Sequence, residues 1–385
     1  MEQDKEDKKV NNFRPSDLSY KGADLFSKFR RFDLKEQLRS VTDVLHCNLV
    51  SKFDKGENID PQDLSIYEHL SPEDFASDPG WLFAPVLVAT NEEQLNITRQ
   101  KCSLWAKLHE TYVFKWRTNV TRIVNPAAPT LMGNIEENNA FFWQYFVEGA
   151  SGFLTETING ELALVNGAPV TMHSLTFSTK QEHDIVKQRI MRGDFEYGDE
   201  IVIDIPACVN VEVSQSLDGK EVTERRQSQL DVLQTLSTHK KKIILPLVTS
   251  KGHKKPKKFN FFNQSTNQPY SEVQIQNPFS FQLGFSMTVH KAQGRTIDKV
   301  VLDLHYKPNY NKRLKFDGIF VALSRVRSRS SIRLIKHANT SFEEAYGYIS
   351  RLRPAPNVMA FYRGFTGDPK EGQVWDMQLA LGVPD

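Results

Sequence analysis

Residues 288–296 read Thr-Val-His-Lys-Ala-Gln-Gly-Arg-Thr, and the segments on both sides of this run decide the fold. Phe279–Thr288 before it is apolar, and Lys299-Val-Val-Leu-Asp-Leu after it is typical of a buried strand. Gly294 lies in the polar turn that leaves the first apolar segment. A residue without a Cβ lets the backbone approach a phosphate or ribose closely at such a turn. The pattern predicts an α/β fold.

The same alternation of strand and helix occurs elsewhere in the chain. Phe83–Thr90 is a short apolar run of the buried-strand kind, and Asn91-Glu-Glu-Gln can cap a helix with an acidic first turn over about 92–109. The other expected elements are helical residues 22–55, a loop at 71–80, a strand at Tyr112–Trp116, a helix at Gly318–Arg327 that carries Arg325, a strand at Ser331–Ile335 and a loosely packed tail from Arg353.

The middle of the chain, about 150–265, has a different character. Strand-like runs separated by polar turns predominate there and alternate with little helix, which predicts a small β-barrel or a β-rich insertion. The runs are 161–165, 170–177, 200–205, 209–213 and 242–248. Lys254 and Lys255 belong to the basic run at 251–258. Charge alone does not decide whether this run is a solvated loop or a loop that contacts phosphates.

Composition narrows the class of protein. The 385 residues are 39% hydrophobic and 25% charged, which is enough for two domains or for one domain with a large insertion. The net charge is only +2, so global charge does not indicate nucleic-acid binding, although a local basic surface is compatible with it. Three widely spaced cysteines, a charged N-terminus and no membrane-length apolar stretch predict an intracellular protein without a membrane span.

Two arginines are candidate catalytic residues. Arg39 lies in Glu36-Gln-Leu-Arg-Ser40 and Arg325 in Val321–Arg327, each after an apolar stretch that would fix the direction of its side chain. A guanidinium is permanently charged and presents a rigid fork of donors, which suits the charge that spreads over a γ-phosphate during transfer. Taken alone, each arginine is more often a solvated surface residue or half of an ion pair than a catalytic group.

The run at 288–296 also offers donors for a nucleic-acid backbone. Thr288, His290 and Lys291 supply a hydroxyl, an imidazole and an ammonium group within one turn. A single histidine is more often a hydrogen-bonded structural residue, and Gly294 can simply end a strand. The sequence contains no zinc-protease, nucleophile-elbow or dinucleotide motif, and no cluster of metal ligands is predicted.

Together, these segments resemble the PIF-type DNA helicases, the RecD-like branch of superfamily 1 that includes helicases of rolling-circle transposons. The run 288–296 is similar to motif V of that family, Val321–Arg327 to motif VI, and Phe29–Arg39 to the motif IV region that opens the second RecA-like domain. Ala84–Asn91 matches the next strand and helix cap, and Leu162–Ala168 the Val-Asn-Gly turn of a small inserted barrel. The likeness covers about 17 to 340.

The resemblance implies an α/β fold, a RecA-like second motor domain with an inserted small β-barrel-like domain. The implied boundaries are a disordered 1–16, a discontinuous RecA-like domain at 17–150 and 277–345, an inserted β-rich domain at 151–276 and a tail at 346–385. The implied roles are arginine fingers for Arg39 and Arg325, nucleotide contacts for Gln37, Gln293 and Gly294, and nucleic-acid contacts for Asn91, Thr288, His290, Lys291, Lys254 and Lys255.

One part of such a motor is missing from this sequence. A P-loop needs G-x-x-x-x-G-K-[ST], and the single Gly-Lys pair, Gly219-Lys220, is followed by Glu221. No apolar strand ends in the Asp-Glu pair that would hold Mg²⁺. The family implies ATP and Mg²⁺ as cofactors, and we expect the phosphate-gripping and Mg²⁺-binding groups to come from an N-terminal RecA-like half, in cis or in trans.

Three hypotheses follow. The chain is the C-terminal half of an ATP-dependent DNA helicase, inactive by itself, with DNA as its partner and a nuclear or mitochondrial location. Alternatively, it is a non-catalytic nucleic-acid-binding or regulatory module that uses the basic run at 251–258. The third hypothesis is a degenerate relic whose fold survives only in part.

Overall fold

Two units make up the part of the chain that the computed structural model describes. The described residues are 25, 28–32, 39–124, 137, 139–160, 164–213, 243–249, 257–262, 269–307, 313–337, 339–369 and 371–381. The first unit comprises Met1–His69, Gly294–Asp298 and Leu304–Asp385, and the second comprises Leu70–Gln293 and Lys299–Asp303. The domain boundaries at 150, 277 and 346 that the resemblance implies differ from the boundaries of these two units. They stay a prediction.

Parallel strands form the α/β part of the second unit. β2 (Val86–Val88) lies between β14 (Ser286–Thr288) and β15 (Val300–Leu302) and pairs with both in parallel. All residues of these three strands are buried, which explains the continuous apolar runs in the sequence. The structure therefore confirms the strands expected near 83–90 and 299–304 and the mixed α/β class.

The apolar segment 279–288 contains two short strands instead of one. β13 (Phe281–Leu283) pairs antiparallel with β6 (Ser151–Leu154), whereas β14 joins the parallel sheet. Gly284 separates them, and its backbone N–H donates to the carbonyl of Ser151 at 2.8 Å. A Cβ at Gly284 would lie 3.1 Å from the Ser151 hydroxyl, so a small residue fits this change of sheet.

Helix α4 (Asn91–Leu108) follows β2 and packs against β2, β14 and β5. Its buried face repeats every four residues, at Gln94, Thr98, Cys102 and Ala106. The expected helix is confirmed, but its N-cap is Thr90, one residue before the expected Asn91. The Thr90 hydroxyl accepts from the Glu93 N–H at 3.2 Å, and the Glu93 carboxylate accepts from the Thr90 N–H at 3.3 Å.

Antiparallel strands form the rest of the second unit. The described strands are β3 (Val113–Arg117), β4 (Asn119–Val124), β5 (Trp143–Val147), β6, β7 (Pro169–Thr176), β8 (Glu200–Val202), β9 (Cys208–Val213), β10 (Ile243–Leu247), β11 (Lys257–Phe262), β12 (Pro269–Gln276) and β13. Their sheet orders are β10-β9-β7-β6-β13, β11-β12-β4 and β5-β3-β8, in which only the β3–β8 pair is parallel. The expected β-rich character is present, while a barrel-like closure stays a proposal.

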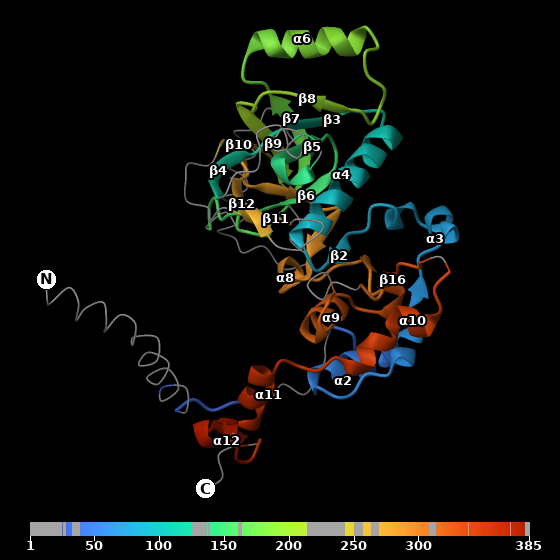
Figure 1. Cartoon of the computed structure of the whole chain (residues 1–385), viewed down its shortest axis with the longest axis vertical. Coiled ribbons are helices and arrows are strands. Elements are labelled where there is room, and N and C mark those ends of the chain that lie inside the picture. Colours follow the sequence, from blue (N-terminus) through green and yellow to red (C-terminus); the bar gives the residue numbers. More distant parts are fainter. Residues whose placement is uncertain are drawn as a thin grey trace, which may run out of the picture. The chain divides into compact units, whose positions relative to one another are not determined.

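Helices α6, α3 and η2 of this unit were not expected from the sequence. α6 (Lys180–Met191) buries Val186 alone, so its apolar periodicity is weak (Figure 1). The expected loop at 71–80 contains α3 (Pro72–Ser77) and η2 (Pro79–Trp81). The Ser71 hydroxyl and the Asp74 carboxylate form a capping box at α3, so the polar and proline residues there begin a helix.

The first unit has its own parallel strand pair and helices. β1 (Glu68–His69) pairs in parallel with β16 (Ile332–Leu334), and α2 (Val44–Asp54) packs against α9 (Phe316–Leu323). The rings of Phe53 and Phe316 lie 5.0 Å apart at this helix contact. Before its C-terminal tail the unit also contains η1 (Pro61–Ile66), η5 (Arg329–Ser331), α10 (Phe342–Tyr346) and η6 (Gly347–Arg351).

The expected helix at 318–327 is shorter than the sequence indicates. α9 ends at Leu323 with Ser324 as its C-cap, so Arg325 lies just after the helix and not on it. The tail, expected to pack loosely, forms α11 (Pro356–Arg363), the β17–β18 hairpin (Phe365–Thr366 with Val374–Trp375) and α12 (Met377–Leu381).

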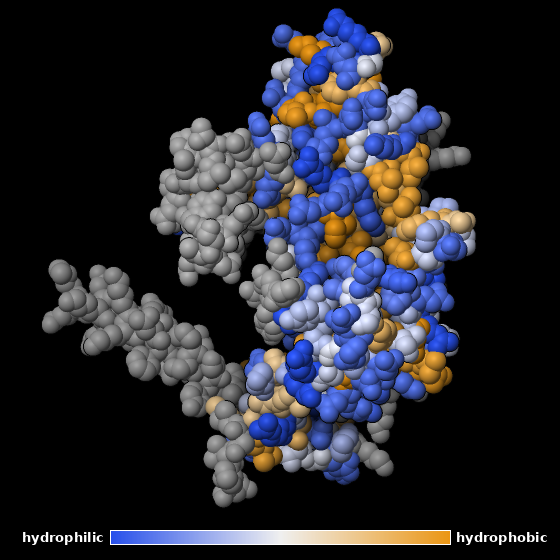
Figure 2. Space-filling model, turned by 45° about the vertical axis from the view of Figure 1, so that its right-hand side comes forward, coloured by the Kyte–Doolittle hydropathy of each residue, from blue (hydrophilic) through white to orange (hydrophobic). Residues whose placement is uncertain are grey.

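Apolar side chains also reach the surface. Figure 2 shows hydrophobic patches separated by polar surface on the face it draws. Val41, Val44 and Leu45 are 63%, 66% and 50% exposed, close in sequence to Arg39. Among the described helices, none combines the length and the apolar character that crossing a membrane requires.

We predict that Thr90→Ala lowers the free energy of unfolding by about 1 kcal/mol, because α4 loses its N-cap oxygen. Urea titration followed by tryptophan fluorescence measures the change. Thr249→Ala, at an exposed position after β10, is the matched control. An equal shift in both variants would contradict a capping role for Thr90.

Candidate nucleotide and nucleic-acid site

The two candidate catalytic arginines meet at the C-terminal end of α9. The Arg39 Nη1 donates to the carbonyl of Ser324, and the Arg325 Nη2 donates to the hydroxyl of the same Ser324 at 2.7 Å. The Arg325 Nε also donates to the carbonyl of Val321 at 3.0 Å. Residues that are 286 positions apart are therefore brought together by the last turn of one helix.

Electrostatics at this point favour an anion. Burial lowers the pKa of Arg325, and the positive charge of Arg39 lowers it further. Within the described residues, neither guanidinium forms an ion pair with a carboxylate. Two like charges held together without a carboxylate attract a group that carries several negative oxygens.

An open cavity adjoins Arg39 within the first unit, and Arg325 is not among the residues that line it. Arg39, Val41, Thr42, Thr296 and Arg327 line it. Its polar groups are guanidinium and hydroxyl donors, and none of the described residues that line it is acidic. Thr42, Thr296 and Arg327 were not singled out from the sequence, although Thr296 and Arg327 close the two motif-like runs and that position was an available signal.

The turn at Gly294 reaches the same neighbourhood through the backbone. Gly294 has a φ of +81°, which L side chains rarely adopt, so this turn requires glycine for its conformation. Three residues later, the Ile297 N–H donates to the carbonyl of Arg325 at 2.9 Å. Burial lowers the pKa of the intervening Arg295. The segment 295–297 therefore lies against the loop after α9 that carries Arg325.

The half-buried Asp43 and the buried His46 lie next to the loop after α9 that carries Arg325. The Asp43 carboxylate caps α2 by accepting from the His46 N–H at 3.2 Å, and its other oxygen accepts from the Arg329 N–H at 2.8 Å. The His46 ring is buried and its Nδ1 lies 2.9 Å from the Tyr67 hydroxyl. Burial lowers the pKa of this ring, the backbone of Val326 and Leu323 opposes that shift, and the ring Nε2 forms no hydrogen bond with the described residues. Asp43 therefore connects the start of α2 to Arg329, which follows the loop that carries Arg325.

The other part of the run 288–296 belongs to the second unit. Thr288 is buried at the start of α8 (Val289–Ala292), whereas His290 is exposed. The Lys291 ammonium donates to the Gln282 side-chain oxygen and lies 5.8 Å from the Phe153 ring centroid. Gln293 is exposed and its N–H donates to the His290 carbonyl at 3.4 Å. The described contacts bring Lys291, but not His290, to a polar partner.

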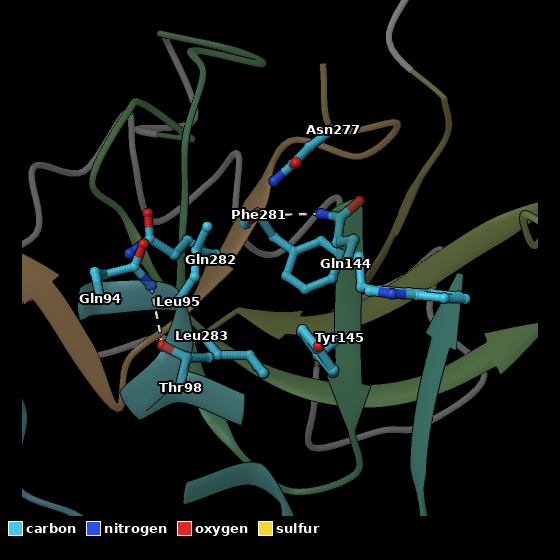
Figure 3. Close-up of a pocket in the computed structure, with 10 residues that line it drawn as sticks. Gln94, Leu95, Thr98, Gln144, Tyr145, Asn277, Phe281, Gln282 and Leu283 are labelled. Carbon is cyan, nitrogen blue, oxygen red and sulfur yellow. Dashed lines mark hydrogen bonds between the residues drawn. The ribbon is translucent and has the colours of Figure 1, made fainter. Parts of the chain in front are cut away.

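Gln282 also lines a small polar pocket of the second unit, shown in Figure 3. The Gln94 amide points to Thr98, with a 3.0 Å hydrogen bond, and the Gln144 amide donates to the carbonyls of Phe279 and Phe281 at 3.1 and 3.4 Å. The Gln282 amide donates to the Ser286 carbonyl at 3.3 Å, and this bond joins β13 of an antiparallel sheet to β14 of the parallel sheet. Asn91, the first residue of α4, is exposed one turn before Gln94.

Three candidate residues, Gln37, Lys254 and Lys255, lie outside the described residues. Their roles stay predictions from the sequence. Among the residues that the structure does describe, no group of three or more histidine, cysteine, aspartate or glutamate side chains could hold a metal ion.

Comparison with known proteins gives a structural likeness only. No family model matches the sequence, and no curated protein matches it. Three of the solved structures that this chain resembles are Pif1 helicases. Pif1 helicase from Candida albicans is 16% identical with a TM-score of 0.42, and the match covers 80% of this chain and 56% of that one. Bacteroides Pif1 bound to single-stranded DNA is 12% identical with a TM-score of 0.44, covering 90% and 59%.

A third solved structure, Bacteroides Pif1 in complex with ADP-AlF3 and single-stranded DNA, is 13% identical with a TM-score of 0.44 and covers 87% of this chain and 56% of that one. The chain therefore spans little more than half the length of the structures it matches.

We predict that protonation of His46 destabilises the first unit. Burial lowers the pKa of His46 below its ordinary 6.5, so the unfolded chain binds the proton more readily. The stability that the neutral ring contributes is present above pH 6.5 and is lost as the pH falls below that value. Urea midpoints at about pH 7.5 and about pH 5 should differ less in His46→Gln than in wild type.

His183→Gln, at an exposed histidine of α6, is the matched control for this experiment. Its pH dependence should equal that of wild type. A pH dependence of His46→Gln that also equals wild type would show that the buried ring does not sense pH.

Proposed function

We propose that this chain is the arginine-bearing half of a helicase-type ATPase motor. The observation that carries the proposal is the convergence of Arg39 and Arg325 on Ser324, beside a cavity lined with cationic and hydroxyl donors. Guanidinium forks of this kind stabilise the negative charge that develops on a transferring phosphoryl group. The motif-like runs that contain both arginines, and their order along the chain, support the same assignment.

The chain's own residues fit the phosphate part of ATP and do not fit Mg²⁺. Arg39, Arg327 and Thr296 offer donors to phosphate oxygens, whereas no carboxylate stands among the described residues of the lining. The sequence holds no P-loop, so the groups that grip the β- and γ-phosphates and Mg²⁺ would come from a second RecA-like domain. In this proposal, Arg39 and Arg325 complete that partner's site, and exposed Val41, Val44 and Leu45 give the partner an apolar surface to cover.

DNA is the second ligand in this proposal. Lys291 is a half-buried cation whose ammonium donates to Gln282 near the buried ring of Phe153, so its charge would act on phosphates and the ring would not stack a base. Exposed Asn91 and His290 and the lysines at 254 and 255 would add contacts to phosphates or bases. The antiparallel strands between β6 and β12 would form the inserted domain that holds the strand. Such a role belongs in a compartment with DNA, the nucleus or a mitochondrion.

We predict that the arginine cavity binds inorganic tripolyphosphate weakly, with a Kd on the order of 1 mM at low salt. Arg39→Ala and Arg325→Ala should each weaken binding about threefold to tenfold, because each removes a charge-assisted donor. Isothermal titration calorimetry on the whole chain measures the affinities. Arg351→Ala, at an exposed position at the end of η6, is the matched control.

The control should bind like wild type. If Arg351→Ala loses as much affinity as the two cavity variants, the attraction is one of general surface charge. The assignment of Arg39 and Arg325 to a phosphate site would then be wrong.

A non-catalytic nucleic-acid-binding module is the competing function, and the basic run at 251–258 favours it. If Lys254 and Lys255 each neutralise one phosphate, the double variant Lys254→Ala/Lys255→Ala should lower the slope of log affinity against log salt by about 1.4 for single-stranded DNA. Fluorescence anisotropy with a labelled oligonucleotide at several salt concentrations measures the slope. Lys55→Ala/Lys336→Ala, at exposed positions of the first unit, is the control.

A slope that falls equally in both double variants would remove the basic run as a specific contact. Absence of any binding to the oligonucleotide at low salt would refute the hypothesis of a nucleic-acid-binding module.

A further inference from the structure

The C-terminal tail forms a small structure with its own hydrogen bonds. We use "C-terminal module" for the described residues of 356–381, which hold α11, the β17–β18 hairpin and α12 (Figure 1). The Trp375 indole N–H donates to the Phe361 carbonyl at 3.0 Å, and the Asp376 N–H donates to the Gly364 carbonyl at 2.7 Å. The Asp376 carboxylate then accepts from the backbone of α12. The resemblance to the helicase family ends before this module.

The module holds one segment from the other end of the chain. We use "leading segment" for residues 28–32, which precede Arg39 by a few positions. The Arg31 N–H donates to the Gln373 carbonyl at 2.8 Å, and the Gln373 N–H donates back to the Arg31 carbonyl at 2.9 Å. This reciprocal pair is an antiparallel bridge between residues that are 342 positions apart.

Side chains extend the contact on both sides of the bridge. The Arg31 guanidinium lies 4.4 Å from the Phe365 ring centroid and 5.2 Å from that of Tyr362. The Arg30 Nη1 donates to the Glu371 carbonyl at 2.9 Å. The backbone of Gly372 comes so close that an added Cβ would lie 2.8 Å from the Phe32 ring and 3.0 Å from the Arg30 Cβ. The fit therefore depends on the absence of a side chain at Gly372.

Directional bonds, not burial, make this contact. Phe29 and Phe32 of the leading segment stay 63% and 62% exposed, and Phe361 and Tyr362 of the module stay 41% and 46% exposed. Covering apolar surface would leave such rings buried. The module instead fixes the position and the direction of the backbone at Arg31, which is what a clamp requires and a hydrophobic cover does not.

We infer that the C-terminal module is an internal clamp that holds the leading segment and thereby positions Arg39. Six residues separate Phe32 from Arg39, so the bridge at Arg31 limits where Arg39 can lie. The second anchor is the hydrogen bond from Arg39 to the Ser324 carbonyl. Fixing the chain on both sides of a short connection lowers the conformational entropy that ordering Arg39 costs. The functional meaning of this clamp rests on the proposed function of Arg39.

Two glycines of the module provide a matched pair of variants. Gly372 and Gly367 both have positive φ values, +88° and +100°, so alanine is strained to a similar degree at either position. Only Gly372→Ala places a Cβ against the leading segment, because a Cβ at Gly367 has no heavy atom closer than 3.9 Å. A difference between the two variants therefore reports the contact and not the strain.

Hydrogen–deuterium exchange of the whole chain, measured by mass spectrometry, is the test. We expect exchange at residues 39–43 to rise on the order of fivefold in Gly372→Ala and to stay at the wild-type level in Gly367→Ala. Arg31→Ala, which removes the guanidinium contacts without steric overlap, should give the same rise if Gly372→Ala does not fold. Tripolyphosphate affinity should fall about threefold in the variants that loosen residues 39–43.

The outcomes separate the clamp from the proposed function. Faster exchange confined to residues 28–32, with 39–43 unchanged, would overturn the clamp. Faster exchange at 39–43 together with unchanged tripolyphosphate binding in Gly372→Ala and in Arg39→Ala would establish the clamp and refute the phosphate role of Arg39. Faster exchange with weaker tripolyphosphate binding supports both.

Discussion

The end of helix α9 at Ser324 is the constraint on which the candidate site depends. The last turn of a helix leaves carbonyl groups without intrahelical partners, and these accept hydrogen bonds from cationic side chains. Here the Ser324 carbonyl and hydroxyl accept from Arg39 and Arg325. A helix longer by one turn would place Arg325 on the cylinder and remove the acceptor that Arg39 uses. The position of a single helix end thus decides whether the arginines meet.

The run at 288–296 shows how one short sequence serves two structural environments. Its first part follows a buried strand, so Thr288 and Lys291 are held by the sheet and by Gln282. Its second part follows the positive φ of Gly294, and the chain just beyond it bonds to the carbonyl of Arg325. In the sequence, the donors for a nucleic-acid backbone and the glycine turn form one run. In the structure, the donors belong to the second unit and the chain from Gly294 belongs to the first.

Sequence patterns predicted the buried strands well, because a strand with two covered faces leaves an unmistakable apolar run. The sequence patterns failed where the same polar residues are compatible with a loop and with the cap of a helix. Ser71, with Asp74 three residues on, looks like a loop but forms a capping box, and α6 buries too little to show a helical period. Arg325 could be chosen from its motif, but its place beyond the helix could not, because Ser324 gives no strong stop signal. The contact between Arg31 and Gln373 is non-local and has no trace in either segment alone.

The partner of Arg39 is a carbonyl, and this has a consequence for approach from a distance. A neutral dipole satisfies the donor geometry of a guanidinium but does not cancel its charge. A carboxylate in the same place would have formed a neutral pair with no field beyond contact. Positive charge that stays uncancelled projects a potential over a Debye length of about 8 Å at physiological salt. In the proposed function, the α9 end would therefore hold its arginines in order while their charge attracts a diffusing polyanion before any contact is made.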